Sequence, residues 1–507
     1  MNKKIFLASL ILASAGSLVS CGGTPEIFDH YFSNRLTFAD MGLVNDYEDL
    51  LDNKFISDKV AKVDLKNVTD GDTAVFYLAN GQQDSYTHVL GYTYDYISLR
   101  FLAIDTPEST SQIQAWGTTA SKYAKTLLPK AEGIILDASS IDTTGMSLKD
   151  QCAEGIRFDS NGRWLGMVWY CPEGKNPKKL ENYRSYQLDI IEECYSYFSG
   201  SQTSLGSNYV YYADKKTEKE LYERYADTYG SLTFGDVCFE ASLRMEAKEQ
   251  RYTGYQKDPN FDYSRRPTDY TITEAVANFE ELSYNCTFVR LTGVITSFVG
   301  TNFYFQDAEG TPMYVYMGIE GYGLGAAFKV GDTIMISGRL CMYGGQIQLS
   351  GIDWDSDDTF AKVTGENAIP LPAVTSMVRS DLDVTKIENF LGKVVEIDVT
   401  PSSLGRISKD NSYTVYCNEE VIGLGGNYKE ICIRVNGSLA PDYKREEEIE
   451  PLKGKKVRVK AVMSIYMEDD FTQEEVFPSY QLVLGNVLLY GYIHLLLLLS
   501  YPLLHPS

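Results

Sequence analysis

The chain has 507 residues, with 46 lysines and arginines against 69 aspartates and glutamates, and a formal net charge of −23. At roughly 150 residues per domain the length predicts about three domains, and an apolar content of 44% with only 16 prolines excludes a mainly disordered chain. The negative charge excludes a protein that coats nucleic acid, which needs a broadly basic surface, but it leaves room for a local basic cleft.

The N-terminus has the layout of an export signal. Two lysines precede an apolar run over residues 5–19, which is short for a membrane span and ends in small residues. The Leu-Val-Ser-Cys sequence that ends at Cys21 resembles the bacterial lipobox, in which the cysteine becomes a lipidated first residue; an ordinary signal peptide with an incidental cysteine is the alternative. We expect residues 1–20 to be a signal peptide, residues 21–55 to be a tether, and Cys21 to anchor an exported protein at the cell surface.

One domain is predicted over residues 56–266, beginning with strands and continuing with helices. Helices are expected near residues 112–129, 177–198 and 216–250. In the first of these segments apolar residues recur at a spacing of 3.6 and share one face.

The rest of the chain reads almost entirely as strands and turns. We predict two further β domains, residues 270–362 and 370–490. Gly344-Gly345 separates two β-prone runs, which predicts a hairpin. The leucine-rich tail, residues 491–507, is too short to span a membrane; it is an artefact, a disordered end or an added strand, and we assign it no function.

Neither the cysteines nor the acidic cluster predicts a metal site. No cysteines form CxxC pairs, which argues against a zinc ribbon, and glutamates 446–448 are expected to be a solvated loop. Cys152 and Cys171 flank a possible hairpin and are the best candidates for a disulfide. Four other cysteines lie in strand-like runs, where buried free thiols are expected: Cys286, Cys341, Cys417 and Cys432.

Three short segments carry residues suited to phosphodiester chemistry. Asp72 follows a glycine turn between two strands, Arg100 and Asp105 surround the end of another strand with Glu108 just beyond it, and Arg163 begins a returning strand. Carboxylate and carbonyl oxygens suit a hard cation such as Ca²⁺. Guanidinium groups bind phosphate in a bidentate manner, and a further carboxylate can orient or deprotonate water. With only four histidines in the chain, this combination predicts a metal-dependent phosphodiesterase.

These segments together resemble the staphylococcal-nuclease-like (thermonuclease) family. The resemblance covers residues 59–264 and implies an OB-type five-stranded barrel with three helices. It also implies hydrolysis of DNA and RNA that leaves 3′-phosphates. The matched run is Asp70-Gly-Asp72-Thr73, Arg100-x4-Asp105-Thr106-Pro107-Glu108, Ala115-Trp-Gly117 with Ala120-Ser121, and Asp159-x2-Gly162-Arg163.

The resemblance assigns a role to each matched residue. It implies Asp72 and Asp105 as Ca²⁺ ligands, with the backbone carbonyl of Thr106 beside them. It implies that Glu108 acts as the general base or positions the water.

It further implies Arg100 and Arg163 as clamps for the phosphate and the transition state. Asn161 departs from the family, whose best-known members have a tyrosine there that contacts the terminal phosphate. Tyr209 and Tyr211 are candidate stacking substitutes, although buried strand positions would also explain them.

The C-terminal half resembles OB-fold nucleic-acid-binding domains, so we expect a mainly β protein with helices in which two OB-like barrels follow the nuclease barrel. Such barrels bind single strands through aromatic side chains and a cationic groove. The candidates are Phe303 and Phe305, with Tyr314 and Tyr316; the alternative is that these aromatics fill the barrel. The expected partner is DNA or RNA, preferably single-stranded or denatured, and no protein partner is predicted. The rival function is a non-catalytic nucleic-acid-binding surface lipoprotein.

Overall fold

The structure is a computed structural model of the chain and is mainly β, with 35% of residues in strands and 24% in helices. The residues that it describes are 30–78, 96–110, 113–147, 150–151, 156–159, 161–199, 219–221, 223–224, 232–264, 266–318, 328–352, 360–408, 411–425, 429–467 and 477–485.

The chain divides into two compact units. The first comprises Met1–Pro107 and Trp116–Asp258, and the second comprises Glu108–Ala115 and Pro259–Ser507. The main break therefore lies near the predicted end of the first domain at residue 266. The short segment Glu108–Ala115 groups with the second unit although the sequence motif assigns Glu108 to the first.

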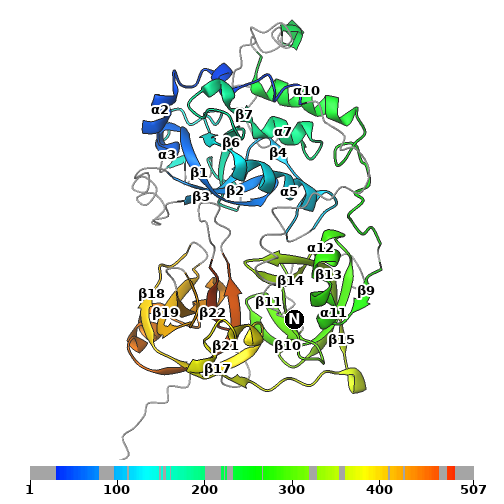
Figure 1. Ribbon diagram of the computed structural model, residues 1–507, viewed down its shortest axis with the longest axis vertical. Helices are drawn as coiled ribbons and strands as arrows, with labels where there is room; N and C mark the ends of the chain where they lie inside the picture. The colour runs from blue at the N-terminus through cyan, green and yellow to red at the C-terminus, as the bar shows by residue number, and fades with distance from the viewer. Residues whose placement is uncertain are drawn as a thin grey trace, which may run out of the picture. The chain divides into compact units, whose positions relative to one another are not determined.

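A closed five-stranded barrel forms the core of the first unit (Figure 1). Its strands pair in the order β1-β2-β3-β6-β5, and β5 returns to β1; the β3–β6 pair is parallel and the others are antiparallel. Register shifts between Leu65 and Asn67 and between Val68 and Asp70 bend the long first strand, as β-bulges do. The strands of this unit are β1 (Val60–Asp70), β2 (Thr73–Tyr77), β3 (Tyr96–Phe101), β4 (Ile104–Asp105), β5 (Gly133–Asp137), β6 (Trp164–Cys171), β7 (Arg184–Ser185) and β8 (Tyr197–Phe198).

The helices of the first unit are shorter than the sequence predicted. The expected helix at 112–129 begins only after Trp116, whose φ of 69° is left-handed and cannot continue a helix. The segment 177–198 holds a 3-10 helix and one short α-helix, with a β segment between them and another at its end. The described helices are η1 (Phe38–Met41), α2 (Tyr47–Asp52), α3 (Phe55–Asp58), α5 (Gly117–Leu127), η2 (Leu128–Lys130), η3 (Leu180–Asn182), α7 (Tyr186–Glu192) and α10 (Phe234–Glu246).

The second unit begins with a sheet of the same connectivity. Strand β10 pairs with β11 and β13, and the parallel β12–β14 pair returns this sheet on itself. The predicted Gly-Gly hairpin is confirmed, since Tyr343 pairs with Gln346 and both glycines have positive φ. The elements are β9 (Thr268–Tyr270), α11 (Ile272–Ala277), α12 (Phe279–Tyr284), β10 (Val289–Val299), β11 (Asn302–Gln306), β12 (Pro312–Val315), β13 (Thr333–Tyr343), β14 (Gln346–Ser350) and β15 (Phe360–Val363).

A third sheet repeats the arrangement with a divided first strand. Strands β17 and β18 together take the place of the long first strand, because β17 pairs with β21 and β18 pairs with β19. The parallel pair of this sheet is β20–β22. The elements are η7 (Gly365–Asn367), β16 (Thr375–Ser376), η8 (Arg379–Asp381), η9 (Ile387–Phe390), β17 (Val394–Val399), β18 (Pro401–Leu404), β19 (Tyr413–Glu420), β20 (Glu430–Val435), η10 (Gly437–Leu439), the π-helical η11 (Arg445–Ile449), η12 (Glu450–Leu452), β21 (Val457–Tyr466) and β22 (Ser479–Val483).

Candidate functional site

The turn between β1 and β2 carries the first carboxylates of the predicted motif. Asp70 ends β1, Thr73 begins β2, and all four residues of the turn are buried. Gly71 is needed because a Cβ atom there would lie 2.7 Å from the Oγ1 atom of Thr106. The glycine therefore lets the second motif segment approach the first.

The Arg100 guanidinium lies between two carboxylates and is the centre of the site. Its Nη1 atom forms an ion pair with Asp72, and its Nη2 atom forms one with Asp105. Arg100 is on β3, directly opposite Thr73 of β2. The pairing of these two strands therefore places the arginine beside the turn that carries Asp72. The Asp72 and Arg100 side chains are 3% and 9% exposed, whereas that of Asp105 is 65% exposed, so the cluster opens to solvent at Asp105.

Thr106 and Thr73 hold the Asp72 carboxylate from two sides. The backbone amide and the hydroxyl of Thr106 donate to Oδ2 of Asp72 at 2.9 and 3.0 Å. The hydroxyl of Thr73 donates to Oδ1 at 3.0 Å. Both oxygens of this buried carboxylate are thus fixed by hydrogen bonds, which satisfies the requirement for burying a charge.

Arg163 joins the same network through Thr73. Its Nη1 atom donates to the Thr73 hydroxyl at 3.0 Å, and its Nε atom donates to Oδ2 of Asp159 at 2.6 Å. Asp159 also accepts from the backbone amide of Arg163 at 2.8 Å. The two predicted arginines therefore connect to one aspartate, Asp72, directly in one case and through a threonine in the other.

Glu108 is the predicted residue that this network does not include. It is exposed, and its backbone amide donates to the Gln114 side chain at 3.1 Å while its carbonyl accepts from the Gln114 amide at 2.9 Å. These bonds belong to the segment Glu108–Ala115, which groups with the second unit.

Two further residues support the site, and no sequence motif pointed to them. The Tyr186 hydroxyl donates to the Gly71 carbonyl at 2.6 Å, and the Ser196 hydroxyl accepts from the Asp105 amide at 2.9 Å. Burial, reinforced by the charges of Asp72 and Asp70, raises the pKa of Tyr186 well above its usual value, so its hydroxyl stays protonated and donates. Tyr186 begins α7 and Ser196 follows that helix.

A left-handed residue turns the chain between Arg100 and Asp105. Ala103 has a φ of 68° and is fully buried between β3 and β4. This conformation is uncommon for a residue other than glycine and is found where the surrounding structure imposes it. It brings Asp105 back toward the arginine five positions earlier.

In the described part of the chain no group of three or more histidine, cysteine, aspartate or glutamate side chains could hold a metal ion. Two carboxylates, those of Asp72 and Asp105, converge on one guanidinium group. Their oxygens are of the type that Ca²⁺ takes. The oxygens are therefore of the right type, but Arg100 pairs with both carboxylates in this structure, and calcium at this place stays a prediction.

The aromatic candidates of the second unit prove to be core residues. Phe303 and Phe305 are 3% and 0% exposed and pack inside the sheet formed by β10–β14. A stacking platform needs accessible ring faces, so the prediction that these two residues bind substrate is corrected: they are core residues of this sheet, as the stated alternative had it. Tyr314 and Tyr316 are half-buried, and the Tyr314 ring lies 4.8 Å from that of Tyr304.

Tyr304 lies where the second sheet meets the third. Its hydroxyl donates to Ser464 of β21 at 3.3 Å, and Val299, Val462 and Val483 pack with it in one cluster. Tyr314 packs against the same cluster. Part of the aromatic surface near β11 and β12 is therefore used to join the two β-sheets of the second unit.

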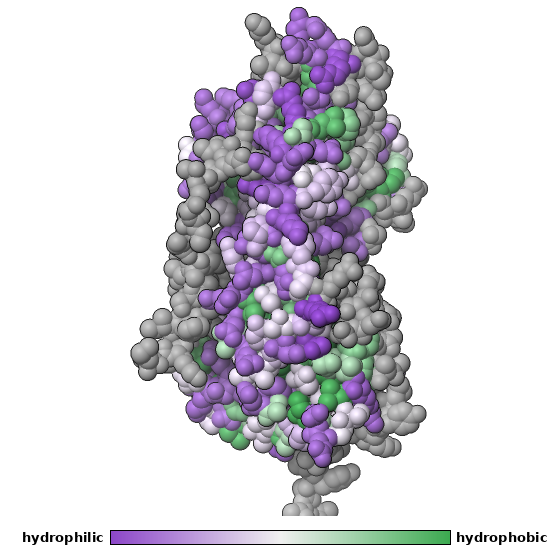
Figure 2. All heavy atoms as spheres, turned by 90° about the vertical axis from the view of Figure 1, so that its right-hand side faces the viewer, coloured by the Kyte–Doolittle hydropathy of each residue, from purple (hydrophilic) through white to green (hydrophobic). Residues whose placement is uncertain are grey.

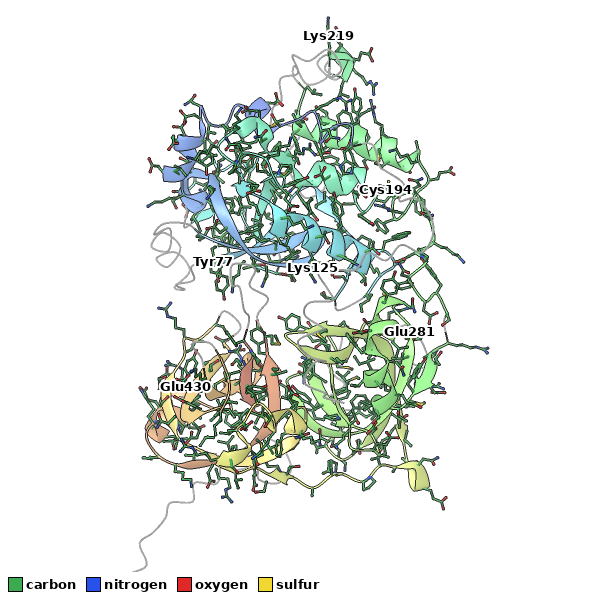
Figure 3. All side chains as sticks on the ribbon, in the orientation of Figure 1. Tyr77, Lys125, Cys194, Lys219, Glu281 and Glu430 are labelled. Carbon is green, nitrogen blue, oxygen red and sulfur yellow. The ribbon has the colours of Figure 1, made fainter. Side chains whose placement is uncertain are left out.

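Several predicted residues lie outside the described residues, namely Cys21, Tyr209, Tyr211 and Cys152. Cys171 is a buried free thiol, which corrects its proposed disulfide, and burial raises its pKa to about 11. Cys194, which follows α7 (Figure 3), is also buried and free. The expected free thiols are confirmed: Cys286, Cys417 and Cys432 are buried and Cys341 is partly buried.

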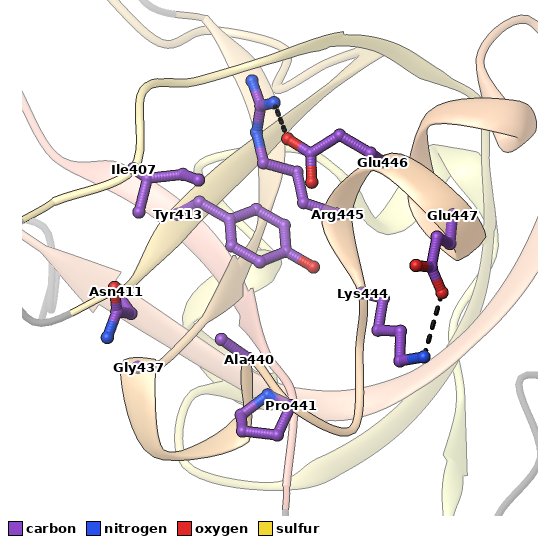
Figure 4. A pocket seen from close by; sticks show the side chains of 10 residues that line it. All are labelled: Ile407, Asn411, Tyr413, Gly437, Ala440, Pro441, Lys444, Arg445, Glu446 and Glu447. Carbon is purple, nitrogen blue, oxygen red and sulfur yellow. Dashed lines mark hydrogen bonds and ion pairs between the residues drawn. The ribbon is translucent and has the colours of Figure 1, made fainter.

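A cavity of about 390 Å³ lies in the third sheet and is lined partly by the acidic cluster (Figure 4). Arg445 pairs with Glu446 at 2.7 Å, and Lys444 pairs with Glu447 at 2.9 Å. These glutamates are neutralised by adjacent cations, as expected for a solvated surface turn. None of the carboxylates and arginines of the Asp72–Arg100 network lines this cavity.

Two comparisons with known proteins were without a match. No protein-family model matches the sequence, and no curated protein matches it. Among the helices of the described residues, none is long and apolar enough to cross a membrane.

Proposed function

We propose that the first unit is a phosphodiesterase that hydrolyses DNA or RNA in the manner of the staphylococcal-nuclease-like family. The observation that carries this proposal is the bridging of Asp72 and Asp105 by Arg100. These three residues come from two motif segments, and the pairing of β2 with β3 brings Asp72 beside Arg100. The connectivity β1-β2-β3-β6-β5 with one parallel pair supports the OB-type barrel that the resemblance implies.

The roles follow from the charges and the access to solvent. Arg100 and Arg163 would bind the non-bridging oxygens of the scissile phosphate and stabilise charge that develops there. Asp72 and Asp105, with the Thr106 carbonyl, would hold Ca²⁺, which when bound neutralises phosphate charge. Asp105 is the exposed edge of the cluster, so substrate would approach from its side.

Glu108 remains the proposed group that orients or deprotonates water. It stands two residues beyond Thr106 on an exposed segment, where solvent water reaches it. An exposed carboxylate can accept a hydrogen bond or a proton from water. We further propose that the substrate is single-stranded or denatured and that the products carry 3′-phosphates. The protein would be exported and held at the membrane by a lipid anchor at Cys21.

The decisive experiment measures hydrolysis of denatured DNA by the purified protein. Activity should require Ca²⁺ and disappear in excess EGTA, and Arg100→Lys should lower kcat by about 10²-fold or more. Glu108→Gln should lower kcat while substrate affinity survives. A protein that binds denatured DNA but cleaves none of it at any Ca²⁺ concentration is the non-catalytic lipoprotein instead. Full activity in EGTA would overturn the calcium assignment alone.

A further inference from the structure

The predicted tether, residues 21–55, is folded into the first unit from His30 onward, where it forms η1 and α2 and begins α3. The backbone amides of Phe32 and Ser33 donate to the Glu192 carboxylate at 2.7 and 3.0 Å. The His30 ring contacts Asp189 through Nδ1 at 3.0 Å and Glu193 through Nε2 at 2.7 Å. All three acidic residues lie on or directly after α7, so this helix binds residues 30–33, the first described part of the predicted tether.

Helix α10 lies beside that entry point. The Arg244 guanidinium carbon is 4.5 Å from the ring centre of Tyr31 and 4.9 Å from that of Phe32. Arg244 belongs to α10, and α10 packs against α7, as Figure 1 also shows. Residues 31 and 32 therefore lie next to α10, and a membrane anchor at the N-terminal end of the tether would keep this helix close to the bilayer.

The outer face of α10 carries two large apolar side chains. Phe239 and Leu243 are 45% and 44% exposed, and their i, i+4 spacing places them next to each other. The opposite face is buried in the unit through residues such as Val237 and Met245. Figure 2 shows hydrophilic side chains over most of the face that it presents, with hydrophobic ones in small groups.

The flank of this pair carries one carboxylate and two guanidinium groups, so it is positively charged. Glu240 accepts from Arg224 at 2.8 Å and from Arg244 at 3.4 Å, and both arginines are exposed. Arginines beside an aromatic and an aliphatic side chain suit the headgroup interface of a bilayer, where guanidinium groups meet lipid phosphates and amphipathic helices bury their apolar face. The chain's net charge of −23 disfavours a strongly anionic surface.

We propose that Phe239 and Leu243 insert into the headgroup region of the membrane that carries the lipid anchor. The proposal rests on the anchor at Cys21. His30 is nine positions after Cys21, and a fully extended chain of that length spans about 30 Å. The anchor thus keeps α10 within reach of the bilayer. Because the chain is already attached to the membrane, α10 meets the bilayer at a high effective concentration, and even a weak affinity for the headgroup region is then enough for insertion. The first unit would then be oriented on the membrane.

The test places an indole at Phe239 in the acylated full-length chain. The Phe239→Trp variant is bound to phosphatidylcholine vesicles whose acyl chains carry bromine, a contact quencher of indole emission. Leu51→Trp is the matched control, because Leu51 is equally exposed, at 44%, on α2 at another side of the unit (Figure 1). The parent chain supplies the background of the native tryptophans.

We expect at least a twofold loss of the added emission at position 239, relative to unbrominated vesicles, and little loss at position 51. Equal quenching at both positions on an acylated chain would contradict the insertion of the α10 face into the membrane. It would not contradict the lipid anchor. An unmodified Cys21, seen in the mass of the N-terminal peptide, overturns the anchor and this surface with it. An emission change at 239 that follows protein concentration in detergent assigns the face to a second copy and also overturns the proposal. Nuclease activity enters none of these readouts.

Discussion

The hydroxyl of Tyr186 donates a 2.6 Å hydrogen bond to the backbone carbonyl of Gly71, and so joins helix α7 to the turn that presents Asp72. Both groups are buried, and the two residues are 115 positions apart in the sequence. The segment after α7 supports the candidate site as well, since Ser196 accepts a hydrogen bond from the Asp105 amide and Tyr197 pairs with Asp105 between β8 and β4.

Replacing Tyr186 by phenylalanine should therefore affect both stability and activity. The ring stays in place, but the Gly71 carbonyl loses its donor, which costs about 1–3 kcal/mol in the free energy of unfolding. We expect urea denaturation to show this loss and hydrolysis of denatured DNA to fall. Tyr183→Phe is the control, because Tyr183 is equally buried and its hydroxyl donates to the Pro177 carbonyl at 2.8 Å. Equal activity losses in the two variants would argue against a role in positioning Asp72.

A methyl group at position 71 should disturb Thr106. In Gly71→Ala the new Cβ atom would lie 2.7 Å from Oγ1 and 3.0 Å from Cγ2 of Thr106, so the threonine must shift and its bonds to Asp72 weaken. Overpacking of this kind costs about 1–3 kcal/mol. The test is a double-mutant cycle of unfolding free energies, measured by urea denaturation of Gly71→Ala, Thr106→Ala and the double variant. The double variant should lose less free energy of unfolding than the sum of the two single losses. Strict additivity would contradict the close approach.

The attachment of the tether should depend on pH through His30. Burial opposes the imidazolium, but the hydrogen bonds to Asp189 and Glu193 and their charges outweigh it and raise the pKa of His30 to about 10. The unfolded value is about 6.5. Since the folded pKa is the higher one, the stabilisation is complete below about pH 6.5 and is lost as pH rises to about 10.

The measurement compares the unfolding free energies of the wild type and His30→Gln across this range. The difference should be roughly 2–4 kcal/mol near pH 6 and should shrink steadily toward pH 10. A difference that is the same at every pH would show that His30 contributes packing and not charge.

Truncation of Phe305 should destabilise the second unit without a specific effect on binding. Phe305 is fully buried, and replacing such a phenylalanine by alanine costs about 3–5 kcal/mol. Below its lowered melting temperature the variant should bind a labelled oligonucleotide as the wild type does. Tyr316→Ala, at a half-buried position, tests whether an aromatic ring near the surface contributes to binding. Normal stability with lost binding in Phe305→Ala would restore its stacking role.

Much of the fold followed from local sequence patterns. The glycine turn before Asp72, the strand with Arg100 and the Gly344-Gly345 hairpin all lie where the sequence placed them. Such features depend on neighbouring residues, because alternation and turn chemistry act over a few positions. Helix limits were less accurate, since the left-handed conformation of Trp116 is set by its contacts with Gln256 and Asp258 far along the chain.

By itself the sequence determined which residue types could act on a phosphodiester: carboxylates and arginines, with very little histidine. Only the tertiary structure decided that Arg100 bridges Asp72 and Asp105, that Tyr186 and Ser196 support them, and that Phe305 is core rather than surface. The physical reason is that these contacts form when the barrel closes. Closure sets which strand faces point inward and which distant backbone groups meet, and no local spacing encodes either.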